Sequence, residues 1–448
     1  MAALTRAWAP TNGCGGVDEQ VHSVMAPESL PIPEVSGAPV AAPTRPVRVL
    51  HIITRMIVGG AQENTLLSCA LIDRDRFPSE ILCGPETGSE GSLHDDCRRS
   101  AVITHFEPAL RRSIHPWRDF VALERLTRFI LRGRYDIVHT HSSKAGVLGR
   151  IAARRARTPV VVHTVHGWPF SQEESFVHRA LWVNLERFCA GLADAIVVVG
   201  SADREKGLEL GIGRPDQYHL IRSGIDVEHY RGASIDRGQV RSRLGLPPGA
   251  FVVGSVGRLS PQKAPLDLLG AFEPVARARP DAHLVLVGDG PDRPAVEAAV
   301  RQSNLGERVH LAGLRRDVPA MMSAFDVFAL ASHWEGLPRV LPQAMAAGLP
   351  IVASRANGVP DAVVNGENGW LVDIGDVAGM SRRLLELSQD PSGARRMGER
   401  GRERVEEFSA RRMVDQLTVL YRRLVLWKEA PAARTEGQAV QEPPARVA

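Results

Sequence analysis

Cysteine and aromatic residues are scarce in this chain of 448 residues, which has five cysteines and 5% aromatic residues. The cysteines, at positions 14, 69, 83, 97 and 189, form no C-x-x-C pair and no spacing typical of a metal site. They therefore indicate reduced thiols in a cytosolic protein rather than a disulfide framework. Long apolar runs are also missing, since the run at residues 195–199 is at most a buried strand and none approaches the length that spans a bilayer.

A strong excess of one charge sign is absent as well. The chain has 55 Lys and Arg against 51 Asp and Glu, a net charge of +4. This balance weakly favours anionic small ligands or an acidic membrane surface, and it argues against a dedicated nucleic-acid-binding protein. Hydrophobic residues make up 44% and charged residues 24%, which is ordinary for a soluble globular protein, and the length implies two or more domains.

Several signatures of known catalytic sites are missing. There is no P-loop and no Gly-x-Ser-x-Gly, which disfavours ATPases and hydrolases of that type. There is no G-x-G-x-x-G followed by an acidic residue at the ribose position, which weakens the hypothesis of a nicotinamide dehydrogenase. The single D-x-D, Asp73-Arg74-Asp75, lies in a polar stretch at a helix end, so we expect no bound divalent cation and no metal cofactor.

The sequence does contain two series of short β-rich runs that alternate with helical segments. The first series comprises residues 47–53, 78–83, 101–106, 135–139, 160–165 and 195–199. The second comprises residues 251–257, 283–288, 308–313, 327–331, 350–353 and 369–372. This alternation is typical of parallel sheets with helices on both faces, so we predict an α/β fold of two doubly wound Rossmann-like domains.

The composition suggests where these domains begin and end. We predict a disordered leader at residues 1–45, an N-terminal domain at 46–228, a C-terminal domain at 229–408, a helix at 409–428 that packs back, and a disordered tail at 429–448. The leader is rich in Pro, Ala, Gly and Ser and has no continuous apolar core for a signal peptide. We expect neither end to carry chemistry.

A carboxylate follows the expected strand at 327–331. Glu335 precedes the turn Gly336-Leu337-Pro338, and Gln343 lies in the first turns of the helix that comes next. A strand, loop and helix would place Glu335 outside the carboxyl end of a parallel strand, where open α/β sheets bind ligands. A carboxylate beside free backbone N–H groups can bind several sugar hydroxyls, so this stretch predicts sugar chemistry.

Two cations lie on the loop after the expected strand at 251–257. Arg258 and Lys263 could hold both phosphates of a diphosphate and stabilise its charge as it leaves. An Arg and Lys pair on a loop is more often solvated surface, and that alternative stays open. The presence of Glu335 in the same half favours the functional interpretation.

The first half offers weaker candidates. Gly59 and Gly60, between the first strand and helix, would let the backbone approach an anion at the helix N-terminus, although an ordinary turn is the safer interpretation of this pair taken alone. His166 ends the run at 160–165 and could donate to a sugar hydroxyl or stabilise a developing charge, whereas most single histidines only satisfy local hydrogen bonds.

A second polar set, His139, His141 and Lys144, follows another expected strand. No carboxylate lies nearby in sequence to complete a metal site, so we interpret the set as an acceptor-side or phosphate-facing patch. The basic segment at 150–157 could touch acidic lipid headgroups, but the wet face of a helix is the favoured interpretation.

Taken together, these motifs resemble the family-4 glycosyltransferases, retaining nucleotide-sugar enzymes with two facing Rossmann-like domains and a cleft between them (the GT-B fold). The resemblance extends from Val47 to Trp427 and is most specific at residues 51–66, 162–168, 257–263 and 332–354. It implies that Arg258 and Lys263 bind the donor diphosphate and that His166 lies beside the transferred sugar.

The resemblance also implies the remaining donor contacts. Glu335 and the amides of Gly336-Leu337-Pro338 would hold sugar hydroxyls, the Gly59-Gly60 loop would lie close to the donor phosphates, and Leu314 and Arg315 would lie near the nucleobase. The family's second carboxylate, eight positions after the first, contacts the nucleotide ribose. Here that position is Gln343, whose amide can still accept from and donate to hydroxyls. A downstream Gly-Val-Pro usually continues with Glu, and here it continues with Asp361.

We therefore expect a retaining, metal-independent glycosyltransferase of hexosyltransferase type. It would move a sugar from a UDP- or GDP-linked donor to a saccharide or lipid-linked saccharide in cytoplasmic polysaccharide or glycolipid biosynthesis. Peripheral contact with the inner face of the plasma membrane is left open. Two alternatives remain: a nucleotide-sugar 2-epimerase, which shares the fold, and an inactive nucleotide-sugar-binding protein, which only Gln343 suggests. The donor sugar, the linkage and the oligomeric state do not follow from the sequence.

Overall fold

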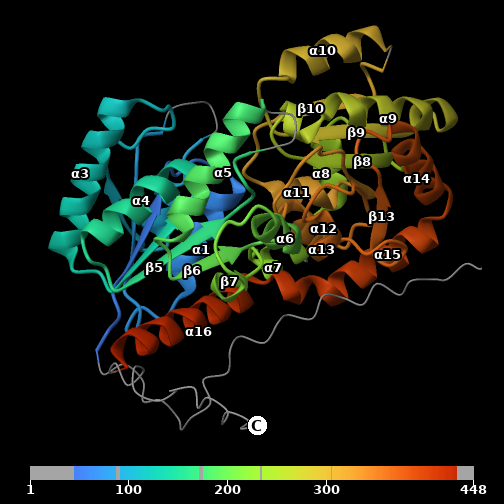
Figure 1. Cartoon of the computed structure of the whole chain (residues 1–448). Coiled ribbons are helices and arrows are strands. Elements are labelled where there is room, and N and C mark those ends of the chain that lie inside the picture. Colours follow the sequence, from blue (N-terminus) through green and yellow to red (C-terminus); the bar gives the residue numbers. More distant parts are fainter. Residues whose placement is uncertain (1–44, 87–90, 171–174, 233–234, 304, 431–448) are drawn as a thin grey trace, which may run out of the picture. The chain divides into compact units, whose positions relative to one another are not determined.

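The computed structural model describes residues 45–86, 91–170, 175–232, 235–303 and 305–430. Most of the predicted leader and tail lies outside these residues, as does Cys14. The elements below all belong to one compact unit, Gly37–Ala448. They form two parallel sheets with helices on their faces (Figure 1), which confirms the predicted α/β fold of two Rossmann-like halves.

The first sheet has seven strands in the order β3-β2-β1-β4-β5-β6-β7, and all neighbours pair in parallel. Its strands are β1 Val49–Ile53, β2 Ser79–Cys83, β3 Ile103–Phe106, β4 Ile137–His141, β5 Val160–Val165, β6 Ala195–Val198 and β7 Tyr218–Leu220. The strand order reverses between β1 and β4. Only β7 was not predicted, because it has three residues and only the first of them is buried.

The second sheet has six parallel strands in the order β10-β9-β8-β11-β12-β13. They are β8 Phe251–Val256, β9 Ala282–Val287, β10 Val309–Gly313, β11 Val327–Leu330, β12 Ile351–Ser354 and β13 Gly369–Val372. All six were predicted, because strands covered on both faces read as short, nearly continuous apolar runs. The order reverses between β8 and β11, so the loops after these two strands diverge.

Helices connect the strands in both halves. In the first half they are α1 Gly60–Leu71, α2 His94–Arg99, α3 Pro116–Gly133, α4 Ser143–Arg155, α5 Phe176–Ala190 and α6 Ser201–Glu209. The later ones are α7 Val227–Arg231, α8 Arg237–Arg243, α9 Pro265–Ala278, α10 Arg293–Gln302, α11 Val318–Ser323, α12 Val340–Ala347, α13 Val359–Ala362, α14 Val377–Gln389, α15 Pro391–Arg404 and α16 Ala410–Glu429.

The last helix, α16, returns to the first sheet (Figure 1). Its N-cap Ser409 accepts a hydrogen bond from the backbone N–H of Arg412 at 3.3 Å. Its apolar face joins the core beneath β1, β5 and β6, where Leu417 and Tyr421 are buried with Val49 and Val160. This is the predicted helix that packs back. Burial of a side chain such as Leu417 stabilises the contact by roughly 1.5–3 kcal/mol.

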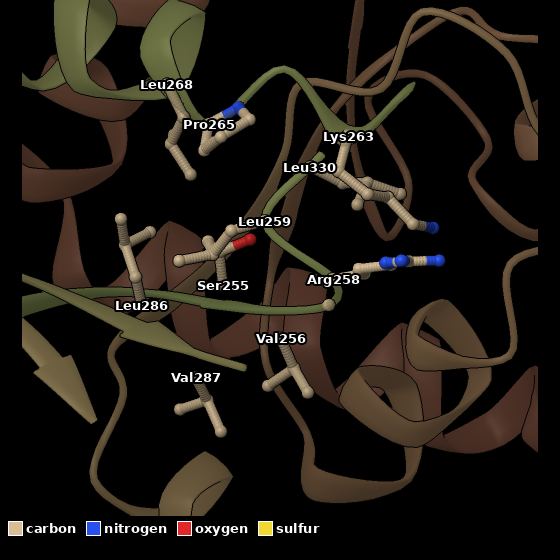
Figure 2. Close-up of a pocket in the computed structure, with 11 residues that line it drawn as sticks. Ser255, Val256, Arg258, Leu259, Lys263, Pro265, Leu268, Leu286, Val287 and Leu330 are labelled. Carbon is tan, nitrogen blue, oxygen red and sulfur yellow. The ribbon is translucent and has the colours of Figure 1, made fainter. Parts of the chain in front are cut away.

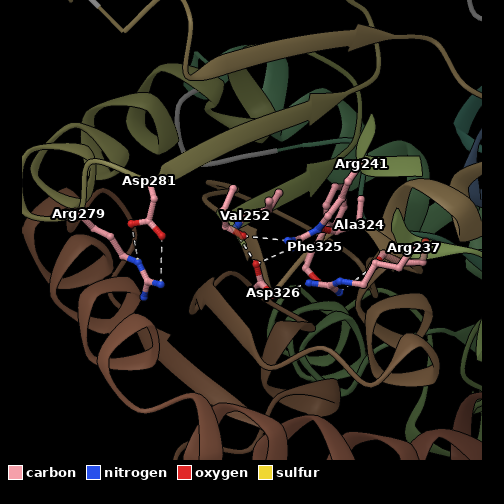
Figure 3. Close-up of polar contacts among 10 residues, drawn as sticks. Arg237, Arg241, Val252, Arg279, Asp281, Ala324, Phe325 and Asp326 are labelled. Atoms are coloured by element: carbon pink, nitrogen blue, oxygen red, sulfur yellow. Dashed lines mark hydrogen bonds and ion pairs between the residues drawn. The ribbon is translucent and has the colours of Figure 1, made fainter. Parts of the chain in front are cut away.

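Helix α8 anchors the segment between the halves to the second sheet. Asp326, just before β11, accepts hydrogen bonds from the Val252 backbone N–H at 2.7 Å, from Arg241 at 2.7 Å and from Arg237 at 2.5 Å (Figure 3). A second pair, Arg279 and Asp281, lies just before β9 (Figure 3). Hence the segment between the two sheets contains a helix that charged side chains hold in place.

The basic segment at 150–157 departs from the prediction of a wet helix face. Arg150 is 1% exposed and forms an ion pair at 2.7 Å with Glu186, which is 1% exposed on α5. Its Nε also donates to the Gly146 carbonyl oxygen at 2.8 Å. Arg155 is exposed, as predicted, and it pairs with Glu124. Arg150 is the exception because α5 covers this side of α4. The periodicity of one helix does not show that a second helix packs against it.

Two further features bear on the predictions. Cys69, Cys83, Cys97 and Cys189 are free and buried. None of the helices in the described part of the chain combines the length and the apolar character that a membrane crossing needs.

Candidate functional site

A pocket of about 790 Å³ lies where loops from the carboxyl ends of both sheets meet. Its volume is within the range of roughly 300–1,000 Å³ that ligand pockets occupy. The structure brings all the predicted catalytic and donor-binding residues to its wall, namely Gly59, Gly60, His166, Arg258, Lys263, Leu314, Arg315, Glu335, Gly336, Leu337, Pro338 and Gln343.

The position of the pocket follows from the strand order of the second sheet. Arg258 and Lys263 lie on the loop after β8, and Glu335 lies on the loop after β11. These are the two strands between which the order reverses, and loops that diverge at such a point leave a crevice. The prediction that Glu335 lies outside a strand end thus has a topological basis.

The loop after β8 presents both cations to the same space. Figure 2 shows the side chains of Arg258 and Lys263 pointing to one side, whereas Leu259, Pro265 and Leu268 lie on the other side. Leu259 and Leu268 are buried, so the loop is fixed from beneath. The orientation of the two cations is therefore a consequence of packing.

Hydrogen bonds join this loop to the loop that carries Glu335. The Gln262 side-chain amide donates to the Trp334 carbonyl oxygen at 2.9 Å, and the backbone N–H of His333 donates to the Gln262 carbonyl oxygen at 2.9 Å. His333 also contacts Asp267 at the start of α9, at 2.9 Å. The distance between the cations and Glu335 is therefore set by the fold.

Lys263 and Glu335 contact each other. The Lys263 ammonium forms an ion pair with Oε1 of Glu335, and the Ser332 hydroxyl donates to the same oxygen at 2.6 Å. Glu335 is 8% exposed. Among the residues that the structure describes, no hydrogen-bond partner is seen for Oε2 of Glu335, so this oxygen can accept from a ligand hydroxyl.

Glycine is required at one point where the two halves meet. A Cβ added to Gly336 would lie 2.6 Å from the His166 carbonyl oxygen, closer than real Cβ contacts. At Gly60 a Cβ would meet Arg339 at 3.6 Å, an ordinary contact. Gly336 therefore permits the close approach of two backbones, whereas at Gly60 a side chain could be accommodated and glycine only keeps the pocket wall free of one.

Sequence reasoning missed an ion pair in the pocket wall. Glu63, in the first turn of α1, pairs with Arg339, and Nε of Arg339 donates to the Gly224 carbonyl oxygen at 3.1 Å. Arg339 directly follows the Gly-Leu-Pro turn, and this position in the sequence could have predicted that Arg339 lies at the pocket. Its partner is 276 residues away, and no local pattern predicts such a pairing.

The loop Asp289-Gly290-Pro291 also lines the pocket and was missed. It follows β9, the neighbour of β8, so its strand ends at the same edge of the sheet. The rule that located Glu335 would have found it.

His139, His141 and Lys144 do not line the pocket, which corrects the prediction of an acceptor-side patch. The two histidines are at most 1% exposed, on the face of β4 that contacts α16. Lys144 is engaged by Asp119 of α3 at 2.5 Å. Strand alternation explains the error, because side chains two apart on a central strand share one face and that face is covered.

One ring nitrogen from each of His51, His139 and His141 lies within 4.8 Å of the others. Both ring nitrogens of His139 are engaged by hydroxyls, Nδ1 with Tyr421 at 2.5 Å and Nε2 with Thr164 at 2.6 Å. The group is thus hydrogen-bonded, and the absence of a metal cofactor stays a prediction.

His166 lies at the pocket wall and is neutral. Burial, together with the nearby Arg339, lowers the pKa of its imidazole to about 3. Its Nε2 contacts Nδ1 of His141 at 3.2 Å. A neutral imidazole can donate or accept one hydrogen bond at the pocket, but it brings no positive charge to a developing anion.

Comparisons with known proteins identify the family. Residues 236–404 match the model described as glycosyl transferases group 1, and residues 59–224 match the glycosyl transferase 4-like domain. The UDP-Gal:alpha-D-GlcNAc-diphosphoundecaprenol alpha-1,3-galactosyltransferase of Escherichia coli is 33% identical over 348 residues, which cover 77% of this chain and 88% of that protein. The chain belongs to the group 1 glycosyltransferases of family 4.

Other proteins similar to this glycosyltransferase have names that specify other substrates or ligands. The D-inositol 3-phosphate glycosyltransferase of Saccharomonospora viridis is 30% identical and covers 65% of this chain and 70% of its own length. HepE of Anabaena, solved in complex with UDP and glucose, has a TM-score of 0.72 at 23% identity and covers 84% of this chain and 99% of its own. That likeness concerns the fold, and it confirms the GT-B architecture.

Proposed function

We propose that this glycosyltransferase transfers a hexose from a nucleotide diphosphate sugar to an acceptor hydroxyl with retention of configuration. The convergence of Arg258, Lys263 and Glu335 on one pocket carries the proposal. Two cations match the two phosphates of such a donor, and a carboxylate matches the hydroxyls of its sugar.

The donor is a UDP-sugar. The E. coli relative is named for UDP-Gal, and HepE was solved with UDP and glucose, so uridine nucleotides recur among the similar proteins. In the proposed binding mode the diphosphate lies against Arg258 and Lys263, and the uracil lies near Leu314 and Arg315. The ribose contacts Gln343, which is 5% exposed at the pocket wall.

Charge on the departing diphosphate is stabilised by side chains, so we propose that the reaction requires no divalent cation. Arg258 and Lys263 donate hydrogen bonds to the phosphate oxygens as the bond from the anomeric carbon to phosphate breaks. Lys263 leaves Glu335 to do so, which frees a carboxylate oxygen for the sugar. Chelation with EDTA should leave turnover unchanged.

The acceptor attacks from the face that the diphosphate leaves. A covalent route would need a carboxylate free to attack the anomeric carbon. Among the described residues of the pocket wall the carboxylates are Glu63, Asp289 and Glu335. Glu63 pairs with Arg339 and Asp289 pairs with Arg293, and in the proposed binding mode Glu335 accepts from the sugar hydroxyls. In the proposed step the acceptor oxygen bonds to the anomeric carbon, and its proton passes to a donor phosphate oxygen.

The acceptor is a lipid-linked saccharide reached at an anionic membrane surface. Exposed apolar side chains lie at the first turns of α3 and α5: Trp117 is 70% exposed, Phe176 is 84% exposed and Val177 is 76% exposed. Both helices begin after strands of the first sheet, at the edge where the pocket loops lie. Arg111 and Arg112 are exposed nearby, and apolar side chains beside arginines suit an anionic bilayer.

The decisive experiment incubates the purified full chain with a panel of UDP-hexoses, with and without a polyprenyl-diphosphate-linked saccharide. We expect product only with acceptor, and an anomeric configuration matching that of the donor by NMR. Conversion of donor alone to an isomer would support the epimerase alternative. Tight donor binding without turnover would support the inactive binding protein.

A further inference from the structure

Three histidines form a hydrogen-bonded row from the interior of the first sheet to the pocket. Nδ1 of His51 lies 2.9 Å from Nε2 of His141, and Nδ1 of His141 lies 3.2 Å from Nε2 of His166. Only His166 lines the pocket. The row crosses three neighbouring strands, because His51 is on β1, His141 ends β4, and His166 follows β5.

Strand register places the three rings on one face of the sheet. His51 is paired with His139, and His141 is paired with Thr164. Side chains two apart share a face, so His141 lies on the face of His51, and His166 continues the face of Thr164. Two rings of the row are thus placed by strands of the sheet, and His166 lies directly after the end of the third strand.

All three imidazoles are neutral at physiological pH. Burial lowers the pKa of His51 to about 3 and holds the pKa of His141 well below its usual range. The pKa of His166 is also lowered to about 3, by burial and by Arg339. A neutral imidazole carries one N–H, so three rings joined by two hydrogen bonds have two possible directions of donation.

The far end of the row decides between the two directions. Nε2 of His51 is buried and has no hydrogen-bond partner among the described residues. If His166 donated to His141 and His141 donated to His51, Nδ1 of His51 would accept. The single N–H of His51 would then be on Nε2, where it would be buried without an acceptor. Buried N–H groups without an acceptor are rarer than acceptors without a donor, so donation runs from His51 toward the pocket.

We propose that His51 and His141 are positioning residues that hold His166 in its Nδ1–H form, so that it donates a hydrogen bond to an oxygen of the nucleotide sugar. The inference rests on the proposed function for the identity of that oxygen. It assigns His166 a role as a donor and excludes it as the base that takes the acceptor proton. That proton goes to the donor phosphate instead.

A metal ion shared by His51, His139 and His141 would contradict this arrangement. Both nitrogens of His141 are engaged by the neighbouring rings, and both nitrogens of His139 are engaged by Tyr421 and Thr164, so a metal would have to break these hydrogen bonds. Elemental analysis of the purified chain should therefore find no stoichiometric zinc, nickel or copper. A stoichiometric metal that His51→Phe removes would overturn the proposal.

The tautomer can be read directly. In the full chain labelled with nitrogen-15 histidine, long-range proton–nitrogen correlation spectra should show His166 protonated at Nδ1, with the signals assigned by their loss in His166→Gln. Protonation of His166 at Nε2 in the unmutated protein would refute the proposal. This readout needs no activity, so it separates a wrong tautomer of His166 from a wrong functional assignment.

Variants test the link between the rings. His51→Phe keeps a ring in place but removes the first donor, so we expect a mixture of His166 tautomers and a fall in turnover of about tenfold, within the range that a single hydrogen bond contributes. Tyr421→Phe is the matched control, because it removes a hydrogen bond to the neighbouring His139 but not one within the row. It should leave the tautomer and the turnover unchanged. An unchanged His166 tautomer in His51→Phe would contradict the role of His51.

Discussion

At the scale of single residues, Lys263 forms an ion pair with Glu335. In the proposed binding mode a diphosphate competes with Glu335 for the Lys263 ammonium, and once Lys263 moves away the buried carboxylate can accept from sugar hydroxyls. The exchange couples phosphate binding to sugar binding, because neither partner is left unpaired in the occupied pocket. Arg258, on the same loop, would contact the diphosphate without breaking this pair.

The first prediction concerns Arg258. We expect Arg258→Ala to lower turnover by about 10²–10³-fold, the usual effect of removing one group that stabilises transition-state charge. Initial rates with a UDP-hexose and acceptor measure this. Arg301→Ala, an exposed position on α10 that does not line the pocket, is the control. Near-normal transfer by Arg258→Ala would contradict the assignment.

The second prediction concerns Gln343. Gln343→Glu introduces the second carboxylate that the family resemblance leads one to expect, and a carboxylate accepts more strongly from ribose hydroxyls than an amide does. We expect the KM for the donor to fall by about threefold to tenfold, as one better hydrogen bond provides. Gln389→Glu, at the end of α14, controls for added charge. A rise in donor KM would show that the pocket is tuned to the amide.

The third prediction uses the pKa of Asp203. Burial and the nearby Asp361 raise the pKa of this carboxyl to about 7, from an ordinary value of 3.8. Between these values the unfolded chain has released the proton that the folded protein retains. This group therefore reduces stability progressively as pH rises from 3.8 toward 7, and the loss stays constant above.

Asp203→Asn removes this ionisation. We expect the variant to be more stable than the parent at about pH 8, by on the order of 1–2 kcal/mol, and the difference to shrink at about pH 5. Buried histidines weaken both proteins equally in acid, so the difference isolates Asp203. Thermal unfolding at the two pH values measures it, and a gap independent of pH would refute the predicted ionisation.

At the scale of secondary-structure elements, the loops after β8 and β11 are held by hydrogen bonds through Gln262 and by the close approach of Gly336 to His166. Gly336→Ala should push these backbones apart. We expect a loss of about 1–3 kcal/mol in stability, typical of overpacking, and a large loss of turnover. Gly306→Ala is the control, because an added Cβ there meets nothing within 4 Å. Equal turnover in both variants would contradict this prediction.

Periodicity predicted twelve of the strands because each is a short apolar run, and it missed β7, where only Tyr218 is buried. The pocket residues could be predicted because they follow the carboxyl ends of strands, and the carboxyl ends of parallel strands lie at the same edge of a sheet. Pairings across the chain were beyond reach: Arg339 with Glu63, and Arg150 with Glu186, join residues that no local pattern relates. His139 was misplaced because its covering residue, Tyr421, lies 282 positions away.

At the scale of the whole molecule, contacts join the two halves around the pocket. Asp361, on α13, accepts from the Ser201 backbone N–H at 2.7 Å and from its hydroxyl at 2.5 Å. Arg316 reaches Asp96 of α2 at 3.2 Å. Together with the pair of Arg339 and Glu63 in the pocket wall, these contacts link the two halves, so a donor that contacted both halves would stabilise the same arrangement.

The last prediction concerns the surface that we propose for membrane contact. Trp117 and Phe120 stack at a ring distance of 6.0 Å on α3, and Phe176 is 84% exposed at the first turn of α5. Replacing Trp117 and Phe176 by Ser removes large apolar area that would otherwise enter the interface. We expect binding to anionic vesicles to weaken by about tenfold or more, since each buried CH₂ contributes about 0.8 kcal/mol.

Cosedimentation with vesicles of anionic phospholipid measures this binding, and vesicles of neutral phospholipid report how much of it depends on charge. Trp427→Ser is the matched control, because Trp427 is 56% exposed near the end of α16, far along the chain from the proposed surface. Turnover of a water-soluble acceptor should be unchanged in the double variant, whereas turnover of a lipid-linked acceptor in vesicles should fall. Equal vesicle binding by the parent and the double variant would remove the membrane from the proposal while leaving the donor site intact.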